Sequence, residues 1–229
     1  MTSLDAVRAG WDEAARQDAM FNIVTFADKV NGGWTPEDFF AHGQVEIDAA
    51  MERLKMFGLG DRHGEPLSTA LDFGCGVGRL TRALAHWYGG VDGVDISEEM
   101  VALARKHVEP EERVAYYVNG NPDLSLFEDD RYDLVYSMIV LQHMPQEFQH
   151  GYVQEFFRVL KPGGVAMFEI PDGPDYRHPH EWLSMFGVPR GTVEGWVTGA
   201  GGTLVDVELL PEPSVWDCLR YTAVLDTAL

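Results

Sequence analysis

From Thr69 onward, short apolar runs alternate with helical segments, and this alternation limits the fold more than any other feature of the chain. The apolar runs are TALDF, VDGVDI, VAYYV, YDLVYSMIV and GGVAMFEI, and the helical segments are Val77–Tyr88, the stretch capped by Ser97 that runs to His107, and Gln146–Leu160. A Lys161-Pro162-Gly163-Gly164 turn is expected to open the fifth run. Strands that alternate with helices predict a parallel sheet covered by helices on both faces.

The end of the chain has a different pattern. Residues 172–191 show no clear period, and TVEGWVTGAG then predicts a short helix. Two apolar runs follow, TLVDVELL and the stretch Val215–Leu225, with only the turn PEPS between them. Because so short a connection cannot cross over a sheet, these two strands are expected to pair antiparallel.

The first 68 residues are helical in pattern and contain no strong strand. Apolar residues recur at helical spacing from Ala41 to Phe57, and Thr35-Pro36-Glu37-Asp38 has the composition of a helix start. The breaker-rich segment GLGDRHGEPLS reads as a linker. We therefore expect an N-terminal helical cap over residues 1–68 and an α/β domain over residues 69–229.

The chain is strongly acidic. Its 229 residues carry 37 acidic against 17 basic side chains, a formal net charge of −20. Such a surface repels phosphate backbones and anionic lipids, which argues against a nucleic-acid or membrane partner. Two cysteines cannot form a disulfide framework, and neither a signal peptide nor a long apolar stretch is present. We expect a cytoplasmic monomer or homodimer that acts on a small molecule.

The segment LDFGCGVGRL places Gly74, Gly76 and Gly78 between a strand and a helix. Glycines there let the backbone turn tightly and approach a ligand at the helix start. Asp95 ends the next strand about 20 residues after the first glycine, where an acid can accept hydrogen bonds from ribose hydroxyls. The sequence therefore predicts a nucleotide site.

The spacing of these glycines bears on which nucleotide binds. A dinucleotide loop reads G-x-G-x-x-G, whereas this loop reads G-x-G-x-G, which counts against a nicotinamide dehydrogenase. Asp72 precedes the loop and suits an ammonium group better than a pyrophosphate. Arg79, which follows the loop, suits a carboxylate or is a solvated helix residue. A methionine moiety carries both an ammonium and a carboxylate, so Asp72 could face the first and Arg79 the second.

The motifs LDFGCGVGRL, GVDIS, YDLVYSMIVLQHM and LKPGGVAMFEI resemble, in the same order, those of the class I S-adenosylmethionine (SAM)-dependent methyltransferases. The resemblance covers Thr69 to Leu225. It implies a Rossmann-like, doubly wound seven-stranded sheet of order 3-2-1-4-5-7-6 with strand 7 antiparallel. It also implies that the N-terminal helices form a lid over the cofactor SAM.

The resemblance assigns cofactor contacts to individual residues. It implies that the glycine loop and its acid hold the methionine part, that Asp95 holds the ribose, and that the backbone at the end of the fourth strand faces the cofactor. The adenine amino group would meet Asn121 or Asp123, because the stretch after the third strand departs from the usual Gly-Asp. The cofactor residues are thus Asp72, Gly74, Cys75, Gly76, Arg79, Asp95, Ile96, Met100, Gly120, Asn121, Ser137 and Met138.

Two residues are candidates for catalysis. His143 follows the fourth strand in SMIVLQHMP, and imidazole titrates near neutrality, so it could accept a proton from an acceptor hydroxyl. Glu169, near the end of the fifth strand, could orient that imidazole or hold a substrate hydroxyl. Both could instead be structural, His143 hydrogen-bonded under the sheet edge and Glu169 a solvated strand-end acid.

The segment PDGPDYRHPHEWL is dense in hydrogen-bonding and stacking groups, and the resemblance places substrate contacts there. We expect Tyr176, His178 and Trp182 to contact the acceptor, together with Trp34 beside the Gly32-Gly33 turn. His178 and His180 lack the i, i+4 spacing of helical metal ligands, so no metal site is assigned. If a metal assists, Glu169 and Asp172 suit Mg²⁺ better than zinc.

These features predict a SAM-dependent methyltransferase that acts on a small molecule. O-methylation of a hydroxyl, on a sugar or a natural product, with His143 as general base is the first hypothesis. N-methylation of a small amine is the alternative within the same class. A NAD-dependent dehydrogenase and a non-catalytic SAM-binding protein are the alternatives from other classes.

Overall fold

The computed structural model describes residues 3–59, 68–109, 112–210 and 217–227. Two compact units make up the chain, one formed by Arg8–Asn119 and the other by Met1–Val7 with Gly120–Leu229. Most of the predicted linker and all of the predicted PEPS turn lie outside the described residues. The expected boundary at residue 68, between cap and α/β domain, stays a prediction.

Helices and strands follow the predicted alternation. In chain order they are α1 (Leu4–Ile23), the 3-10 helix η1 (Ala27–Lys29), α2 (Pro36–Met56), β1 (Thr69–Phe73), α3 (Arg79–Leu84), β2 (Gly90–Asp95), α4 (Glu98–Ala104), β3 (Val114–Val118), β4 (Tyr132–Ser137), η2 (Leu141–His143), α5 (Gln146–Val159), β5 (Leu160–Asp172), η3 (Glu181–Leu183), α6 (Arg190–Gly199), β6 (Gly202–Leu209) and β7 (Asp217–Leu225).

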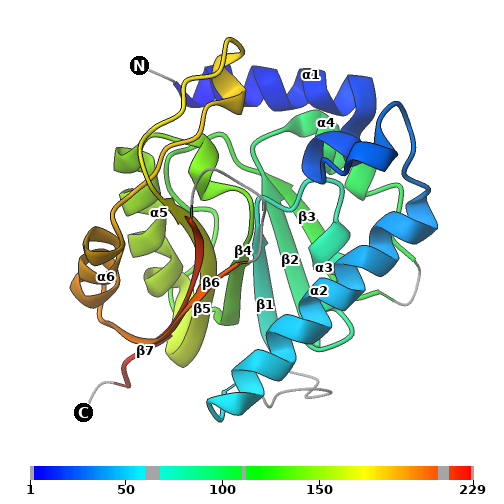
Figure 1. Cartoon of the computed structure of the whole chain (residues 1–229). Coiled ribbons are helices and arrows are strands. Elements are labelled where there is room, and N and C mark those ends of the chain that lie inside the picture. Colours follow the sequence, from blue (N-terminus) through cyan, green and yellow to red (C-terminus); the bar gives the residue numbers. More distant parts are fainter. Residues whose placement is uncertain (1–2, 60–67, 110–111, 211–216, 228–229) are drawn as a thin grey trace. The chain divides into compact units, whose positions relative to one another are not determined.

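The strands form one seven-stranded sheet of order β3-β2-β1-β4-β5-β7-β6 (Figure 1). β1 pairs parallel with β2, β2 with β3, and β4 with β5. β7 runs antiparallel to both β5 and β6. The predicted Rossmann-like sheet, with its strand order and its antiparallel seventh strand, is therefore confirmed. Within each unit, candidate site residues follow the carboxyl ends of parallel strands, which is where ligands bind in sheets of this kind.

In the unit formed by Arg8–Asn119, α2 packs beside α3 (Figure 1). Thr35 caps α2 by accepting a hydrogen bond from the Asp38 amide at 3.1 Å, as the sequence predicts. Gly43 of α2 lies so close to Arg79 that a Cβ there would be 2.6 Å from the Arg79 carbonyl oxygen. This close approach brings the polar face of α2 to the start of α3.

In the unit that contains Gly120–Leu229, the strands β4, β5, β7 and β6 are neighbours in that order. All six residues of β4 are buried, as expected for a central parallel strand with both faces covered. Phe168 of β5 stacks on Tyr221 of β7, with 5.5 Å between ring centroids. α5 and α6 lie side by side, and His150 of α5 stacks on Trp196 of α6 (Figure 1).

Several predicted boundaries are wrong for local reasons. α3 begins at Arg79 rather than Val77, because Gly78 has φ of +87° and cannot be a helical residue. α4 ends at Ala104, short of His107. The Lys161–Gly164 turn is a bulge inside β5 rather than a turn before it. The register there jumps from Tyr132 opposite Leu160 to Leu134 opposite Val165.

Candidate functional site

The loop between β1 and α3 contains three glycines in left-handed backbone conformation. The φ angles are +78° at Gly74, +52° at Gly76 and +87° at Gly78. The amides of Gly74 and Cys75 both donate to the Val94 carbonyl, at 2.8 and 3.0 Å, which folds the loop onto β2. Side chains with a Cβ disfavour this conformation, so the glycines are required by the turn.

Asp95 joins the end of β2 to this loop. One carboxylate oxygen accepts the Gly76 amide at 2.9 Å, and the other accepts the Ser97 amide at 2.8 Å. Burial raises the pKa of Asp95, and the backbone hydrogen bonds oppose that rise. Because a carboxylate oxygen can accept two hydrogen bonds, Asp95 can hold the loop and still accept from ribose hydroxyls.

Asp72 is a fully buried carboxyl group near the end of β1. Its Oδ2 accepts a hydrogen bond from the Thr81 hydroxyl of α3 at 2.6 Å. Burial raises the pKa of Asp72 to about 7. A buried acid of this kind is stabilised in its charged form by a cation, and an ammonium group is one that could supply the charge.

Arg79, the first residue of α3, is buried against α2. Its Nη1 donates to Glu46 Oε2 at 2.6 Å and lies 3.2 Å from His42 Nδ1. Burial and the nearby guanidinium lower the pKa of His42, which favours a neutral ring that accepts from Arg79. The Arg79 Nε has no hydrogen-bond partner. The guanidinium is thus engaged by α2, and its predicted role toward a ligand carboxylate stays a prediction.

α1 docks on the same region through two contacts. Asp12 Oδ1 accepts from the Ser97 hydroxyl at 2.6 Å and from the Glu99 amide at 3.3 Å. Near the end of α1, the Ile23 side chain lies against Gly76, where it would be 2.7 Å from a Cβ. α1 therefore contacts the start of α4 and the glycine loop, and its role as a lid over a cofactor stays a prediction.

Three further residues that the sequence predicts for the site also lie in this unit. Ile96 is half-buried after β2, and Met100 is buried in α4. Trp34 is buried, its Nε1 donates to the Val24 carbonyl at 3.0 Å, and its ring contacts Phe26, Phe39 and His42. Trp34 lies in an aromatic cluster, so a role in substrate binding stays a prediction.

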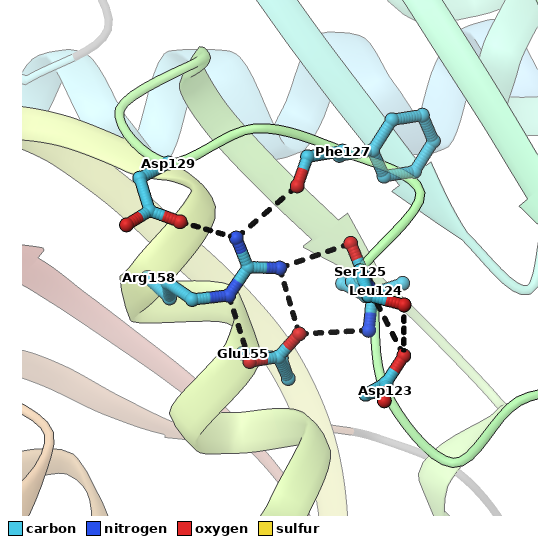
Figure 2. A network of polar contacts seen from close by, with 7 residues as sticks. All are labelled: Asp123, Leu124, Ser125, Phe127, Asp129, Glu155 and Arg158. Carbon is cyan, nitrogen blue, oxygen red and sulfur yellow. Dashed lines mark hydrogen bonds and ion pairs between the residues drawn. The ribbon is translucent and has the colours of Figure 1, made fainter.

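In the other unit, α5 holds the loop that follows β3 and carries Gly120 and Asn121. Tyr152 donates to the Asn121 carbonyl at 2.7 Å. Arg158 donates to the Leu124 and Phe127 carbonyls, and Glu155 accepts the Leu124 amide at 2.7 Å (Figure 2). These hydrogen bonds from α5 hold the loop after β3 in place, although the loop lacks the usual Gly-Asp pair.

Asp123, the other candidate for the adenine amino group, turns its carboxylate toward its own loop. Its Oδ1 accepts from the Ser125 amide at 3.1 Å and from the Ser125 hydroxyl at 2.7 Å (Figure 2). The Ser125 hydroxyl and amide lower the pKa of Asp123. An acid used in this way forms a local turn, which favours Asn121 over Asp123 for an adenine contact.

Ser137 and Met138, at the end of β4, are both buried, and the next residue has an unusual backbone. Ile139 has φ of +61°, a conformation that is a genuine outlier for a β-branched residue. Its amide donates to Glu169 Oε2 of β5 at 3.3 Å. Glu169 is buried, not a solvated strand-end acid.

His143 lies in η2 and is buried. Its Nδ1 is 3.3 Å from the Ser184 carbonyl, so the proton belongs on Nδ1 and the lone pair on Nε2. Burial lowers the pKa of His143 to about 4. The expectation that this imidazole titrates near neutrality is therefore wrong, because that value applies to a solvated ring.

The segment between β5 and α6 folds onto η2 and the start of α5. Tyr176 pairs with Met185 through both backbone hydrogen bonds, and the Phe186 amide donates to the Gln142 carbonyl at 2.8 Å. Gln149 of α5, fully buried, donates to the Phe186 and Met144 carbonyls. The segment that carries the predicted substrate residues is thus fixed beside the His143 helix.

Of these predicted substrate residues, Tyr176 is exposed and Trp182 is half-buried. The His178 amide donates to Ser184 Oγ at 3.1 Å, and the rings of His178 and His180 stack 5.5 Å apart. The part of the chain that the structure describes contains no group of three or more His, Cys, Asp or Glu side chains that could hold a metal ion. Mg²⁺ is given no site.

Residues 70–164 match a family model described as "Methyltransferase domain". A ubiquinone biosynthesis O-methyltransferase from Hydrogenovibrio crunogenus is 34% identical over 101 residues, 44% of this chain and 41% of the relative. A 2-methyl-6-phytyl-1,4-hydroquinone methyltransferase from Synechocystis sp. is 38% identical over 103 residues, 44% of this chain and 31% of the relative. This chain thus covers less than half the length of these curated relatives.

A solved structure extends the similarity of fold to nearly the whole chain. Magnesium protoporphyrin IX methyltransferase from Synechocystis PCC 6803 with bound SAM has a TM-score of 0.69 at 18% identity. The match covers 98% of this chain and 97% of that one. Residues 70–164 thus match a methyltransferase domain, and the chain has the fold of this SAM-bound methyltransferase.

Each unit gathers part of the predicted site. The unit Arg8–Asn119 brings Asp72, the glycine loop and Asp95 together within a few hydrogen bonds. The other unit places His143 beside the segment of Tyr176 and His178 through Ser184. No described helix is long and apolar enough to span a membrane. The contacts of these residues with a cofactor or a substrate stay predictions.

The sequence does not predict three features of the structure, which are the Arg79–Glu46 ion pair, the Asp12–Ser97 hydrogen bond, and the left-handed Ile139 held by Glu169. The first two join residues more than 30 positions apart, and no local pattern signals such pairs. The third had a weak signal, because a buried acid in an otherwise apolar strand needs a donor.

Proposed function

We propose that this chain transfers a methyl group from SAM to a hydroxyl group of a small molecule. The single observation that carries the proposal is the loop of three left-handed glycines tied by Gly76 to the strand-end carboxylate of Asp95. SAM, when bound, supplies an activated methyl group on a sulfonium. The residues of this chain must then bind the cofactor, orient the acceptor and remove a proton.

The residues present fit SAM better than a dinucleotide. Asp72 is a buried acid whose pKa is raised to about 7, and it receives a hydroxyl hydrogen bond from Thr81. A pyrophosphate beside such an acid would be repelled, whereas the ammonium of a methionine moiety would be attracted. Asp95 can accept hydrogen bonds from the ribose, and Ile96 and Met100 offer apolar surface to an adenine.

His143 is the proposed proton acceptor. Hydrogen bonding of Nδ1 to the Ser184 carbonyl directs the basic lone pair to Nε2, the tautomer that a general base needs. Its pKa of about 4 makes it a weak base. A weak base removes a proton more readily from an acidic hydroxyl, so we favour a phenol, with a pKa of about 10, over a sugar alcohol.

Similarity to named relatives supports the same acceptor class. The ubiquinone biosynthesis and hydroquinone methyltransferases are named for pathways or substrates with hydroxylated rings. A phosphoethanolamine N-methyltransferase from Caenorhabditis elegans is also 34% identical, over 126 residues, 54% of this chain and 27% of that relative. N-methylation of a small amine therefore remains the alternative. It would not need a base strong enough to deprotonate an alcohol to an alkoxide.

Calorimetric titration tests the cofactor part of the proposal. The wild-type chain is titrated with SAM, S-adenosylhomocysteine and NAD⁺, next to Asp95→Asn and a matched Glu98→Gln variant on the exposed first turn of α4. We expect micromolar binding of both sulfur nucleotides, retained in Glu98→Gln and weakened at least about tenfold in Asp95→Asn. Binding of NAD⁺ alone, or of no nucleotide, would exclude the proposal. The acceptor is then sought by incubation with phenols, sugars and amines and mass detection of the methyl group.

A further inference from the structure

The backbone two residues beyond β4 is strained. Ile139 has φ of +61°, and the two branches at its Cβ make this region costly. Such a conformation persists only where the surroundings hold it. Ile139 directly follows Ser137 and Met138, whose backbone is expected to face the cofactor, so the strain lies at the functional edge of the sheet.

Glu169 is the group that holds this backbone. Its Oε2 accepts the Ile139 amide at 3.3 Å, and the side chain is only 1% exposed. Ser137 of β4 is opposite Phe168 of β5, so Glu169 is placed one residue farther along, beside the strained turn. A hydrogen bond from an amide to a buried carboxylate is stronger than one to a neutral acceptor.

The neighbouring strands bring a basic residue into register with Glu169. Arg220 of β7 lies directly opposite Glu169 in the register, and Glu208 of β6 lies opposite Arg220 on its other side. Arg220 Nε donates to Glu208 Oε2 at 3.0 Å. Residues opposite each other in antiparallel strands share a face of the sheet, so one arginine is flanked by two acids in adjacent strands.

We propose that Glu169 is a positioning residue that acts through Ile139. It keeps Ile139 in its left-handed conformation and thereby sets the backbone of Ser137 and Met138 for the cofactor. The inference rests on the proposed function, because it takes these two residues as cofactor contacts. It assigns Glu169 a task other than orienting His143 or holding an acceptor hydroxyl.

Four variants test this assignment with S-adenosylhomocysteine as the probe. Glu169→Met keeps the length of the side chain without a carboxylate acceptor, and Glu169→Gln retains an oxygen that can accept. Ile139→Gly removes the strain, and the fourth variant combines Ile139→Gly with Glu169→Met. For each, calorimetry measures affinity for S-adenosylhomocysteine, and hydrogen exchange measures protection of the residue 139 amide.

We expect Glu169→Met to weaken binding by about tenfold and to speed exchange at Ile139. Glu169→Gln should recover most of this affinity. In the Ile139→Gly background, Glu169→Met should cost no more than about threefold, because glycine adopts the conformation without support. A role limited to stability would lower the melting temperature equally in both backgrounds and leave the affinity of the folded protein unchanged.

The failures of the two proposals are distinguishable. If the wild type does not bind S-adenosylhomocysteine, the proposed function fails. If the wild type binds and Glu169→Met binds equally well, or loses the same affinity in both backgrounds, the role of Glu169 through Ile139 is overturned. Should Glu169→Met not fold, rapid exchange of the Ile139 amide in the wild type, or faster exchange of it in Glu169→Gln with unchanged affinity, overturns the assignment.

Discussion

The Thr81 hydroxyl donates to the buried carboxyl group of Asp72 across 2.6 Å, joining α3 to the end of β1. Thr81 is itself fully buried. A neutral hydroxyl lessens the cost of burying this acid but does not remove it, since burial still raises the pKa of Asp72 to about 7. The ionised form of Asp72 is thus unfavourable in the unliganded protein, at the place where the proposed ligand brings an ammonium group.

Asp72→Asn is expected to stabilise the unliganded fold at pH 8. The native pKa of about 7 lies above the ordinary pKa of 3.8, so the contribution of Asp72 to stability is present below pH 4 and is lost as pH rises through 7. The free energy of unfolding of the variant relative to wild type should therefore increase between pH 4 and pH 8, by at most about 4 kcal/mol.

Urea unfolding at pH 5 and pH 8 measures this difference. Asp92→Asn, the same change on the neighbouring strand β2, serves as the control. An Asp72→Asn variant that is less stable than wild type at pH 8 would show that the carboxylate is stabilised by a group already in the protein.

Affinity for SAM should fall in acid because of the same carboxyl group. An ammonium attracts the ionised form of Asp72, which becomes scarce below pH 7, so affinity should decline by up to about tenfold per pH unit between pH 7 and pH 5.5. Calorimetry across this range gives the slope. Asp72→Asn should bind weakly and lose most of the slope, and an unchanged slope in that variant would move the effect to another group, such as Asp95.

Gly78→Ala should destabilise the fold by more than the backbone cost of replacing a left-handed glycine. Gly78 has φ of +87°, and a Cβ there would collide with the Tyr116 hydroxyl. Gly58 is a matched control, because its φ is +71° and nothing lies within 4 Å of the Cβ position. Gly58→Ala should cost about 1 kcal/mol for the backbone alone, and Gly78→Ala about 2–4 kcal/mol.

Tyr116→Phe should rescue part of this loss, since it removes the colliding oxygen. Thermal unfolding of the single and double variants measures the coupling. If Gly78→Ala lowers the free energy of unfolding by no more than Gly58→Ala does, the close packing of Tyr116 on the glycine loop does not contribute to stability.

The sequence predicts those parts of this molecule that depend on local chemistry. The Thr35 and Ser97 caps, the glycine loop and the acid at the end of β2 were identified because short patterns specify them. What it did not predict depends on burial. An imidazole near neutral pKa was expected at His143 because a sequence does not show how deeply a loop residue is covered, and the left-handed Ile139 depends on a carboxylate 30 residues away.

His143 should stay neutral at every pH at which the chain is folded and active. Burial lowers its pKa to about 4, so its Cε1 proton resonance should titrate near pH 4 in NMR spectra rather than near 6.5. A lowered histidine pKa gives stability that is present above pH 6.5 and lost as pH falls toward 4. As pH falls from 6.5 to 4, the free energy of unfolding of His143→Gln should therefore fall by up to about 3 kcal/mol less than that of the wild type. A His143 midpoint near 6.5 would mean that water reaches the ring, which would restore a base of ordinary strength and remove the preference for a phenol.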